Sequence, residues 1–151
     1  MIKIITVGKL KEKYLKDAQE EYLKRLGKYN KVELIEVEDS KIDDSKQALT
    51  EEKNHILKHI NSKDYVITLE ILGKELTSIE LANKIDKTFI NNSDITFIIG
   101  GSYGLHQEIL DRSDYSLSFS KMTFPHQLFR ILLLEQLFRS YKILNNEKYH
   151  K

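Results

Sequence analysis

The sequence has no cysteine and only one proline, Pro125. Without cysteine the chain can form no disulfide, carries no thiolate nucleophile and offers no sulfur ligand to zinc. It also has no long hydrophobic run, because the aliphatic stretch from Ile131 to Leu134 ends at Glu135, far short of the ~20 apolar residues that span a membrane. The residues after Met1 lead directly into a β-branched run and lack the layout of a signal peptide. We therefore expect a cytoplasmic protein with no membrane segment.

Neither sign of charge dominates the chain, since 24 Lys and Arg face 23 Asp and Glu. A polycation wrapped on nucleic acid is thereby excluded. The charges are nevertheless unevenly placed. Residues 8–31 carry eight basic and four acidic side chains, residues 32–52 carry two and eight, and residues 119–151 carry six and two. Two basic ends around an acidic middle suit an anionic partner that meets one face of the fold, although ordinary solvated helices explain residues 9–31 equally well.

The 151 residues, of which 40% are hydrophobic and 31% charged, suffice for one domain with a buried core. Short β-branched runs predict four strands, at residues 2–7, 32–37, 65–69 and 95–99. Between them apolar residues recur at helical spacing, as at Leu15, Tyr22 and Leu26. Strands that alternate with helices predict an α/β fold, with a mostly parallel sheet and helices on both of its faces.

Two local patterns mark the ends of these elements. Thr77 and Glu80 have the spacing of a capping box, just ahead of a helix that carries Ala82, Ile85 and Phe89 on one face. Residues 38–46 are polar and acidic, which predicts a surface loop within the domain.

The last predicted helix has almost no polar face. Its apolar residues are Leu128, Phe129, Ile131, Leu132, Leu133, Leu134, Leu137, Phe138 and Tyr141. A helix that is apolar all round must be buried all round, and a small domain has difficulty covering one alone. We infer that part of this helix packs against a second copy of the chain. A helix that is simply central to one subunit is the alternative.

A first candidate site follows the strand predicted at residues 95–99. There Gly100, Gly101 and Gly104 fall within five residues, ahead of a helix expected near Leu105. Ligands of open α/β sheets lie at the carboxyl ends of the strands, and glycines let the backbone approach them closely. The spacing matches neither a phosphate-binding loop nor a dinucleotide-binding turn. A plain tight connection between strand and helix is the alternative interpretation.

A second candidate site is the stretch 117–126, ahead of the apolar helix. Hydroxyls of Ser118, Ser120 and Thr123 alternate there with apolar side chains, and Pro125 stands where a helix begins. Such a rim suits a ligand that has both a flat ring and polar edges. A proline-started helix with a capping threonine is the alternative.

Four segments of the chain resemble the RlmH family. They are Phe97-Ile-Ile-Gly-Gly-Ser-Tyr-Gly-Leu105, Leu117-Ser-Phe-Ser-Lys-Met-Thr-Phe-Pro-His-Gln-Leu128, Leu134-Glu-Gln-Leu-Phe-Arg139 and the terminal Tyr149-His150-Lys151. The resemblance covers the whole chain, as a single SPOUT methyltransferase domain over residues 1–151. It implies an enzyme that uses S-adenosylmethionine to methylate N3 of pseudouridine 1915 in 23S rRNA, on the large subunit or 70S ribosome. The chain departs from the family pattern at Asn145-Asn-Glu-Lys148, which stands where the family has a glycine and a proline.

The resemblance also implies a C-terminal trefoil knot and a homodimer with the cofactor near the interface. Topology rules alone predict an unknotted chain. By position, the family's cofactor cleft falls on three loops of this chain. Its expected residues are Leu69, Gly100, Phe119, Ser120, Lys121, Met122, Thr123 and Phe124.

The chemistry of the proposed substrate suggests which residues act on it. The imide proton at N3 must depart, which requires a general base or a cation that stabilises the imidate. We hypothesise that His150, beside Tyr149, reaches the base, and that Arg130 or Arg139 steadies developing charge or the rRNA backbone. The expected RNA contacts are Arg139, Lys151 and His126, and no metal is required. Without the resemblance, the terminal residues would be expected to fray.

Two other functions remain open at the level of sequence. One is a different SPOUT activity, such as ribose 2′-O-methylation of tRNA. The other is a non-catalytic RNA-binding ribosome factor that keeps the fold. His55 and His59 stand one helical turn apart, but a solvated helix face explains them better than a metal site because no third ligand is evident.

Overall fold

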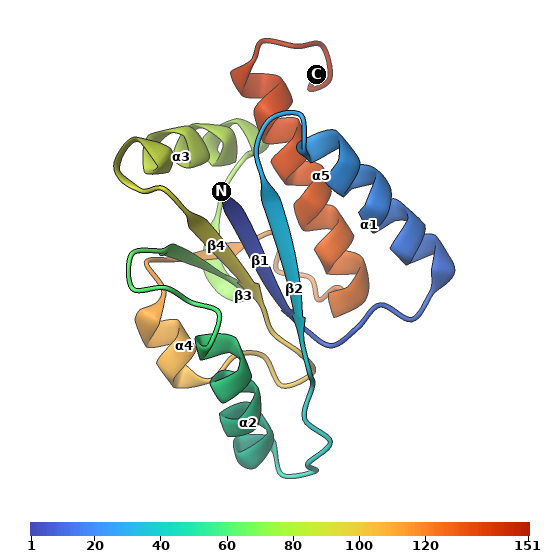
Figure 1. Cartoon of the computed structure of the whole chain (residues 1–151), viewed down its shortest axis with the longest axis vertical. Coiled ribbons are helices and arrows are strands. Elements are labelled where there is room, and N and C mark those ends of the chain that lie inside the picture. The colour runs from blue at the N-terminus through green and yellow to red at the C-terminus, as the bar shows by residue number, and fades with distance from the viewer.

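The computed structural model describes all 151 residues, which form five strands alternating with five helices (Figure 1). The strands are β1 (Ile2–Val7), β2 (Val32–Val37), β3 (Tyr65–Glu75), β4 (Ile95–Ile99) and β5 (Tyr115–Ser118). The helices are α1 (Lys13–Leu26), α2 (Ser45–Leu57), α3 (Ser78–Asn91), α4 (Gln107–Arg112) and α5 (His126–Leu144). None of these helices has the length and apolarity needed to cross a membrane.

The five strands form one sheet in the order β2-β1-β4-β3-β5, and every pair is parallel. Central strands β1 and β4 are buried along their whole length, which explains why they are continuous apolar runs rather than alternating ones. The mostly parallel sheet predicted from the sequence is thus confirmed. The trefoil knot stays a prediction.

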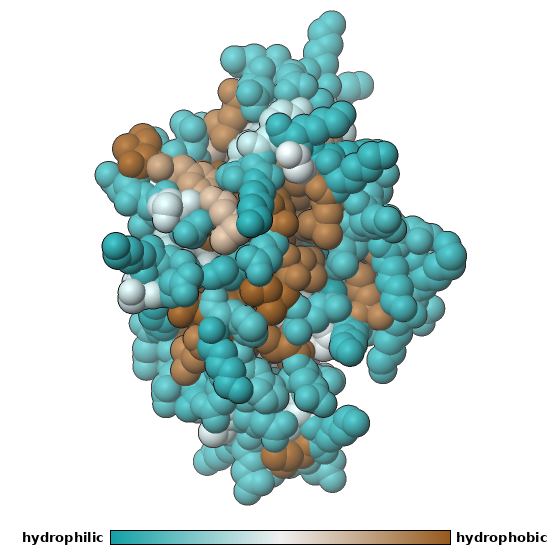
Figure 2. All heavy atoms as spheres, viewed as in Figure 1, coloured by the Kyte–Doolittle hydropathy of each residue, from teal (hydrophilic) through white to brown (hydrophobic).

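Helices cover both faces of the sheet, as predicted (Figure 1). Successive residues of a strand point to opposite faces. Ile4 accordingly joins a 16-residue core cluster with residues of α1, α3 and α5, whereas Ile5 joins a smaller cluster with Ile56 of α2 and Ile109 of α4. In the space-filling view, hydrophobic residues show mainly along the middle of the face, and the periphery is mostly hydrophilic with a few isolated hydrophobic residues (Figure 2).

The predicted ends of the elements hold with two corrections. The capping box forms, since Thr77 Oγ1 accepts from the Glu80 N–H while the Glu80 carboxylate accepts from the Thr77 N–H, both at 3.1 Å. The loop predicted to reach residue 46 ends at Asp44, whose side chain caps α2. Strand β3 continues past Leu69 to Glu75, because the chain bulges out of the sheet and rejoins β5 afterwards.

Helix α5 packs on the sheet between α1 and α3, and the chain itself buries most of it. Leu133, Leu134 and Leu137 are fully enclosed in the main core. The alternative of a helix central to one subunit therefore accounts for most of its apolar surface. Leu128, at its start, is 40% exposed. This end leaves apolar surface for a second copy, and the homodimer itself stays a prediction.

Candidate functional site

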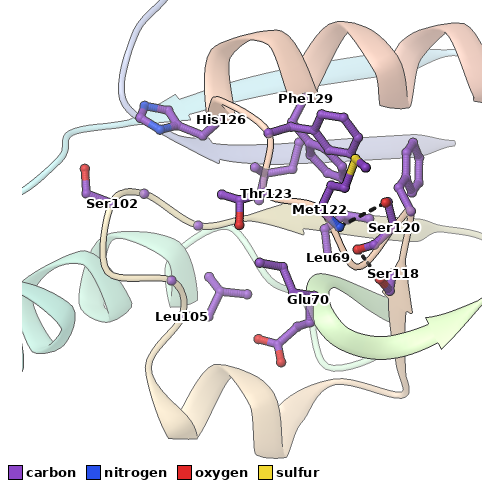
Figure 3. Close-up of a pocket in the computed structure, with 17 residues that line it drawn as sticks. Leu69, Glu70, Ser102, Leu105, Ser118, Ser120, Met122, Thr123, His126 and Phe129 are labelled. Carbon is purple, nitrogen blue, oxygen red and sulfur yellow. Dashed lines mark hydrogen bonds between the residues drawn. The ribbon is translucent and has the colours of Figure 1, made fainter.

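A pocket of about 310 Å³ lies at the carboxyl ends of β4 and β5 and beside β3 at the point where that strand bulges (Figure 3). This volume is within the range of small-molecule sites. In an open parallel sheet, the carboxyl ends of the strands are where ligands bind. The glycine segment and the stretch before α5, which the sequence marked separately, both line this one pocket.

Seven of the eight expected cofactor residues line the pocket: Leu69, Gly100, Phe119, Ser120, Met122, Thr123 and Phe124. The eighth, Lys121, is exposed and lies outside the lining. Lys121 is in the same loop, but at a point where the side chain turns to solvent. The structure thus brings three loops distant in sequence to one cavity.

The glycine turn gives the pocket a wall made of backbone. A Cβ atom on Gly100 would collide with the carbonyl of Gly104, so no other residue fits there. The turn is closed by a hydrogen bond from the Gly104 N–H to the Gly101 carbonyl at 3.1 Å. Gly100 therefore lets the two sides of the turn pack closely together, and the turn presents the main chain of Gly101 and Gly104 to the pocket as well.

The loop between β5 and α5 forms the opposite wall. Ser118 Oγ donates to the Ser120 carbonyl, and Ser120 Oγ accepts from the Met122 N–H, both at 3.0 Å. The ring of Phe129 packs against Phe119 and Phe124, with centroids 4.8 and 6.2 Å away. These contacts fix the loop on the first turn of α5, while Met122 stays 73% exposed at the pocket mouth.

Sequence reasoning missed Glu70, Leu105 and Phe129, which also line the cavity. Glu70 and Leu105 lie on the side opposite Met122 and Phe129 (Figure 3). One feature of the sequence does point to Glu70. It directly follows the last buried residue of a strand, a position where side chains reach the ligand-binding edge of a sheet.

The C-terminal tail docks on α5 instead of fraying. Arg139 donates to Glu135 Oε1 at 2.6 Å and to His150 Nδ1 at 3.1 Å. The Tyr149 hydroxyl donates to the same Glu135 oxygen at 3.2 Å, and the guanidinium lies 4.8 Å from the Tyr149 ring centre. The Tyr149 ring also packs edge-on against Phe138. Four side chains with acid–base or charged character thus form one cluster.

Two groups of this cluster have pKa values above their ordinary values. The hydrogen bond to Glu135 raises the pKa of Arg139 above its ordinary value. Burial, and next the charge of Glu135, raise the pKa of the Tyr149 hydroxyl. Tyr149 therefore remains a hydrogen-bond donor at neutral pH.

Asn146 supplies the turn that folds the tail back. It adopts the left-handed conformation with φ of 55°. The N–H groups of Asn146 and Glu147 bond to the carbonyls of Ile143 and Lys142, which is the Schellman pattern that usually has glycine at this position. Asparagine is the non-glycine residue that best tolerates this conformation. The departure from the family sequence in this segment is thereby accommodated.

Arg130, expected to be catalytic, does not face the pocket. It is 1% exposed and is held by Glu36 at 2.6 Å, Gln19 at 3.1 Å and the Gly8 carbonyl at 3.1 Å. All three partners belong to the N-terminal part of the chain. The structure gives Arg130 the role of tying α5 to β1, β2 and α1.

The expected RNA contacts lie in different places. Lys151 is exposed at the chain end. His126 is at the pocket rim, and its ring points away from the cavity (Figure 3). Arg139 is engaged with Glu135 and His150, so it serves first to position its neighbours.

Figure 1 shows the C-terminal tail at one end of α5 and the loop that precedes α5 at the other. The tail forms the cluster around Arg139, and the loop before α5 lines the pocket. Phe129 lines the pocket, and Arg139 stands ten residues further along the helix. At 1.5 Å per residue the separation along the axis is about 15 Å. A single chain therefore does not bring His150 to the pocket that its own residues form.

Comparison with known proteins gives concordant matches over the full chain. The family model described as "Predicted SPOUT methyltransferase" matches residues 1–150. A protein of Methanococcus maripaludis is 56% identical, and one of Clostridium tetani is 54% identical, each over 99% of both chains. The Clostridium tetani protein is named "Ribosomal RNA large subunit methyltransferase H".

A solved structure shares the fold at low sequence identity. It comes from Haemophilus influenzae Rd KW20 and is described as "a probable methylase family protein". The alignment has a TM-score of 0.58 and 18% identity, and it covers 99% of this chain and 70% of the other. At that identity the likeness concerns the fold alone.

Proposed function

The chain belongs to the SPOUT methyltransferase family, and from this premise we propose that it methylates N3 of pseudouridine 1915 in 23S rRNA with S-adenosylmethionine as donor. The proposed substrate is the large subunit, alone or within the 70S ribosome, in the cytoplasm. The observation that carries the proposal is the convergence of the strand end at Leu69, the glycine turn and the loop before α5 on one pocket. The name of the Clostridium tetani relative supports rRNA as the substrate class.

The pocket fits the proposed donor. The three glycines of the turn line one side of the pocket without side chains. Its lining also includes the hydroxyl residues Ser120 and Thr123 and the rings of Phe119 and Phe124. Apolar walls with a few polar groups suit an adenosine, which has a flat ring and polar edges. When bound, S-adenosylmethionine supplies a methyl group on a cationic sulfur, so the protein has to contribute alignment.

The tail cluster suits the loss of the N3 proton from the target base. A guanidinium can only donate hydrogen bonds, so Nδ1 of His150 accepts from Arg139 and the neutral ring carries its proton on Nε2. In this arrangement His150 donates from Nε2 towards a carbonyl oxygen of the uracil ring. Negative charge on that oxygen grows as the N3 proton passes to solvent water, and a positioned donor stabilises it. Arg139 and Glu135 hold His150 in place.

A second copy of the chain has to bring the two parts together, because one chain holds them at opposite ends of α5. Around the pocket end several large apolar side chains are uncovered: Tyr14 is 69% exposed, Met122 73% and Leu128 40%. They stand on neighbouring elements, since the Lys11 N–H reaches the Gln127 side chain at 3.3 Å. We infer that this surface packs on a twofold-related copy, whose tail then faces the pocket.

The direct test is methyl transfer to ribosomes from a strain that lacks the gene. Purified protein, labelled S-adenosylmethionine and these particles are incubated, and the rRNA is mapped by mass spectrometry. We expect one added methyl group on the base of pseudouridine 1915. Label on a ribose or on tRNA, or donor binding without any transfer, would contradict the proposal.

A further inference from the structure

The pocket contains a single charged side chain, Glu70. No lysine or arginine lines it, and His126 is the only other lining residue with an acidic or basic side chain. The His126 ring points away from the cavity (Figure 3). The charge inside the pocket is therefore set by one carboxylate.

A bulge in β3 places Glu70 there. Leu69 pairs with Leu117 of β5, and the next pairing on the same strand is Lys74 with Leu117, so four residues leave the ladder. At the return point, a Cβ on Gly73 would lie 2.7 Å from the Ser116 carbonyl oxygen, which only glycine avoids. Glu70 is the first residue of a bulge that is anchored at both ends, and it is positioned by the sheet rather than by a free loop.

The Glu70 carboxylate has no partner in the chain. No hydrogen bond or ion pair reaches it, and burial alone raises its pKa above the usual range of a glutamate. The other acid at a functional cluster, Glu135, is satisfied by Arg139 and Tyr149. Glu70 is half-buried, so its carboxylate is partly withdrawn from water without a compensating group in the chain. Such a loss of hydration costs free energy, and groups of this kind cluster at binding sites.

We propose that Glu70 binds the cationic part of the methyl donor and acts as a specificity-determining residue of the pocket. This inference rests on the proposed function. S-adenosylmethionine carries a sulfonium and an ammonium group, and the demethylated product S-adenosylhomocysteine keeps only the ammonium. 5′-Methylthioadenosine has the same adenosine and a methylated sulfur but neither charge. A charge-assisted contact in a poorly hydrated pocket distinguishes these ligands, whereas apolar walls do not.

Binding calorimetry on the full-length protein tests this with no need for turnover. We expect Glu70→Gln to weaken the binding of S-adenosylmethionine about tenfold or more, the usual scale for losing a hydrogen bond to a charged group. Binding of 5′-methylthioadenosine should be unchanged. Glu75→Gln is the matched control, because Glu75 lies exposed on the same strand outside the pocket and should bind all ligands like the wild type.

The product, S-adenosylhomocysteine, shows which of the two positive groups of the donor Glu70 binds. An equal loss for S-adenosylhomocysteine would assign Glu70 to the ammonium, and an unchanged affinity for it would assign Glu70 to the sulfonium; either result supports the inference. S-adenosylmethionine binding by Glu70→Gln within about twofold of the wild type would overturn it. An equal loss for all three ligands would also overturn it, since shape rather than charge would then have changed.

Two failures are distinguishable. If the wild-type protein binds none of the adenosine ligands, the proposed function fails and the inference fails with it. If the wild type binds S-adenosylmethionine and Glu70→Gln binds it equally well, only the inference fails. Thermal melting of the variants checks the fold, and loss of an unpartnered carboxylate should not lower the midpoint.

Discussion

The two ends of α5 differ in how they hold their acidic side chains. At the tail end, Glu135 accepts from Arg139 and Tyr149, and Glu147 accepts from Lys142 and Tyr29. Near the pocket end, Glu70 has no partner, and Glu52, which lies behind the glycine turn, leaves one buried oxygen without a partner. The pKa of Glu147 is lowered by its hydrogen bonds, whereas burial raises the pKa of both Glu52 and Glu70.

This contrast shows which half of the site needs a ligand to be complete. The tail cluster satisfies its own charges, so it is a preorganised device for acting on a substrate that arrives from outside. The pocket carries one uncompensated negative charge and a wall of bare backbone, so it is organised for a cationic small molecule. Changes at the tail should therefore affect transfer, and changes at the pocket should affect donor binding.

Removing the tail is expected to have the largest effect. Deletion of residues 149–151 should lower the rate of methyl transfer to ribosomes by about 10²- to 10⁴-fold, because the donor at His150 and its neighbour Tyr149 are lost. Donor affinity, measured by calorimetry, should stay at the wild-type value. If the truncated chain turns over normally, the tail has no catalytic role.

A methyl group added to the glycine turn should weaken donor binding in the pocket. Gly100→Ala must push the Gly104 carbonyl away, so we expect donor affinity to fall at least about tenfold, equivalent to 1.4 kcal/mol. The control is Gly27→Ala after α1, where a Cβ meets only ordinary contacts at 3.5 Å and the backbone is already right-handed. Equal donor binding by the two variants would mean that the turn does not border the ligand.

Two arginines of α5 should separate stability from transfer. Arg130→Met breaks a buried ion pair, and since Glu36 is 31% exposed and can be rehydrated, we expect a loss of about 2–3 kcal/mol, below the 3–5 of a fully buried pair. Arg139→Met should leave the fold nearly as stable and lower transfer instead. Denaturant unfolding and transfer assays on both variants check this, and a stable, inactive Arg130→Met would restore a catalytic role to Arg130.

The smallest effect is a pH-dependent one at Glu52. The pKa of Glu52 in the folded protein lies above its unfolded value of about 4.3. The free energy of unfolding therefore decreases as pH rises from the unfolded pKa to the folded pKa, and the decrease is complete above the folded pKa. Glu52→Gln should therefore be more stable than the wild type at pH 7, by about 1 kcal/mol or less, and equal to it near pH 4. Glu51→Gln, next on the same helix, is the control. Unfolding midpoints that differ by the same amount at both pH values would exclude this explanation.

The sequence predicted the parts of the site that depend on local patterns. Gly100 and the loop 119–124 directly follow strands, and a strand end next to glycine or to a proline-started helix can be recognised without a structure. Long-range contacts could not be predicted in this way. The partners of Arg130 lie 94 to 122 residues away in the chain, and nothing near Arg130 indicates them.

Glu70 and the tail show two further limits. The place of Glu70 depends on the register between β3 and β5, where one residue of β5 pairs on both sides of the bulge. The order of the tail depends on Asn146 taking the conformation usually given to glycine, and on Glu135 and Arg139 lying within reach of Tyr149 and His150. Single-residue preferences give the chance of such a turn but not the contacts that select it.

Mixed dimers test the central claim most directly, namely that the pocket of one chain works with the tail of another. At a donor concentration below the Kd of the wild type, Gly100→Ala is expected to keep about a tenth or less of the wild-type activity, and the chain lacking residues 149–151 almost none. The two chains are unfolded together, refolded and assayed at that donor concentration as a one-to-one mixture. In a twofold dimer, half of the dimers are mixed and each contains one intact composite site, so activity should return to about a quarter of the wild type. A mixture that stays as inactive as its components would contradict the account.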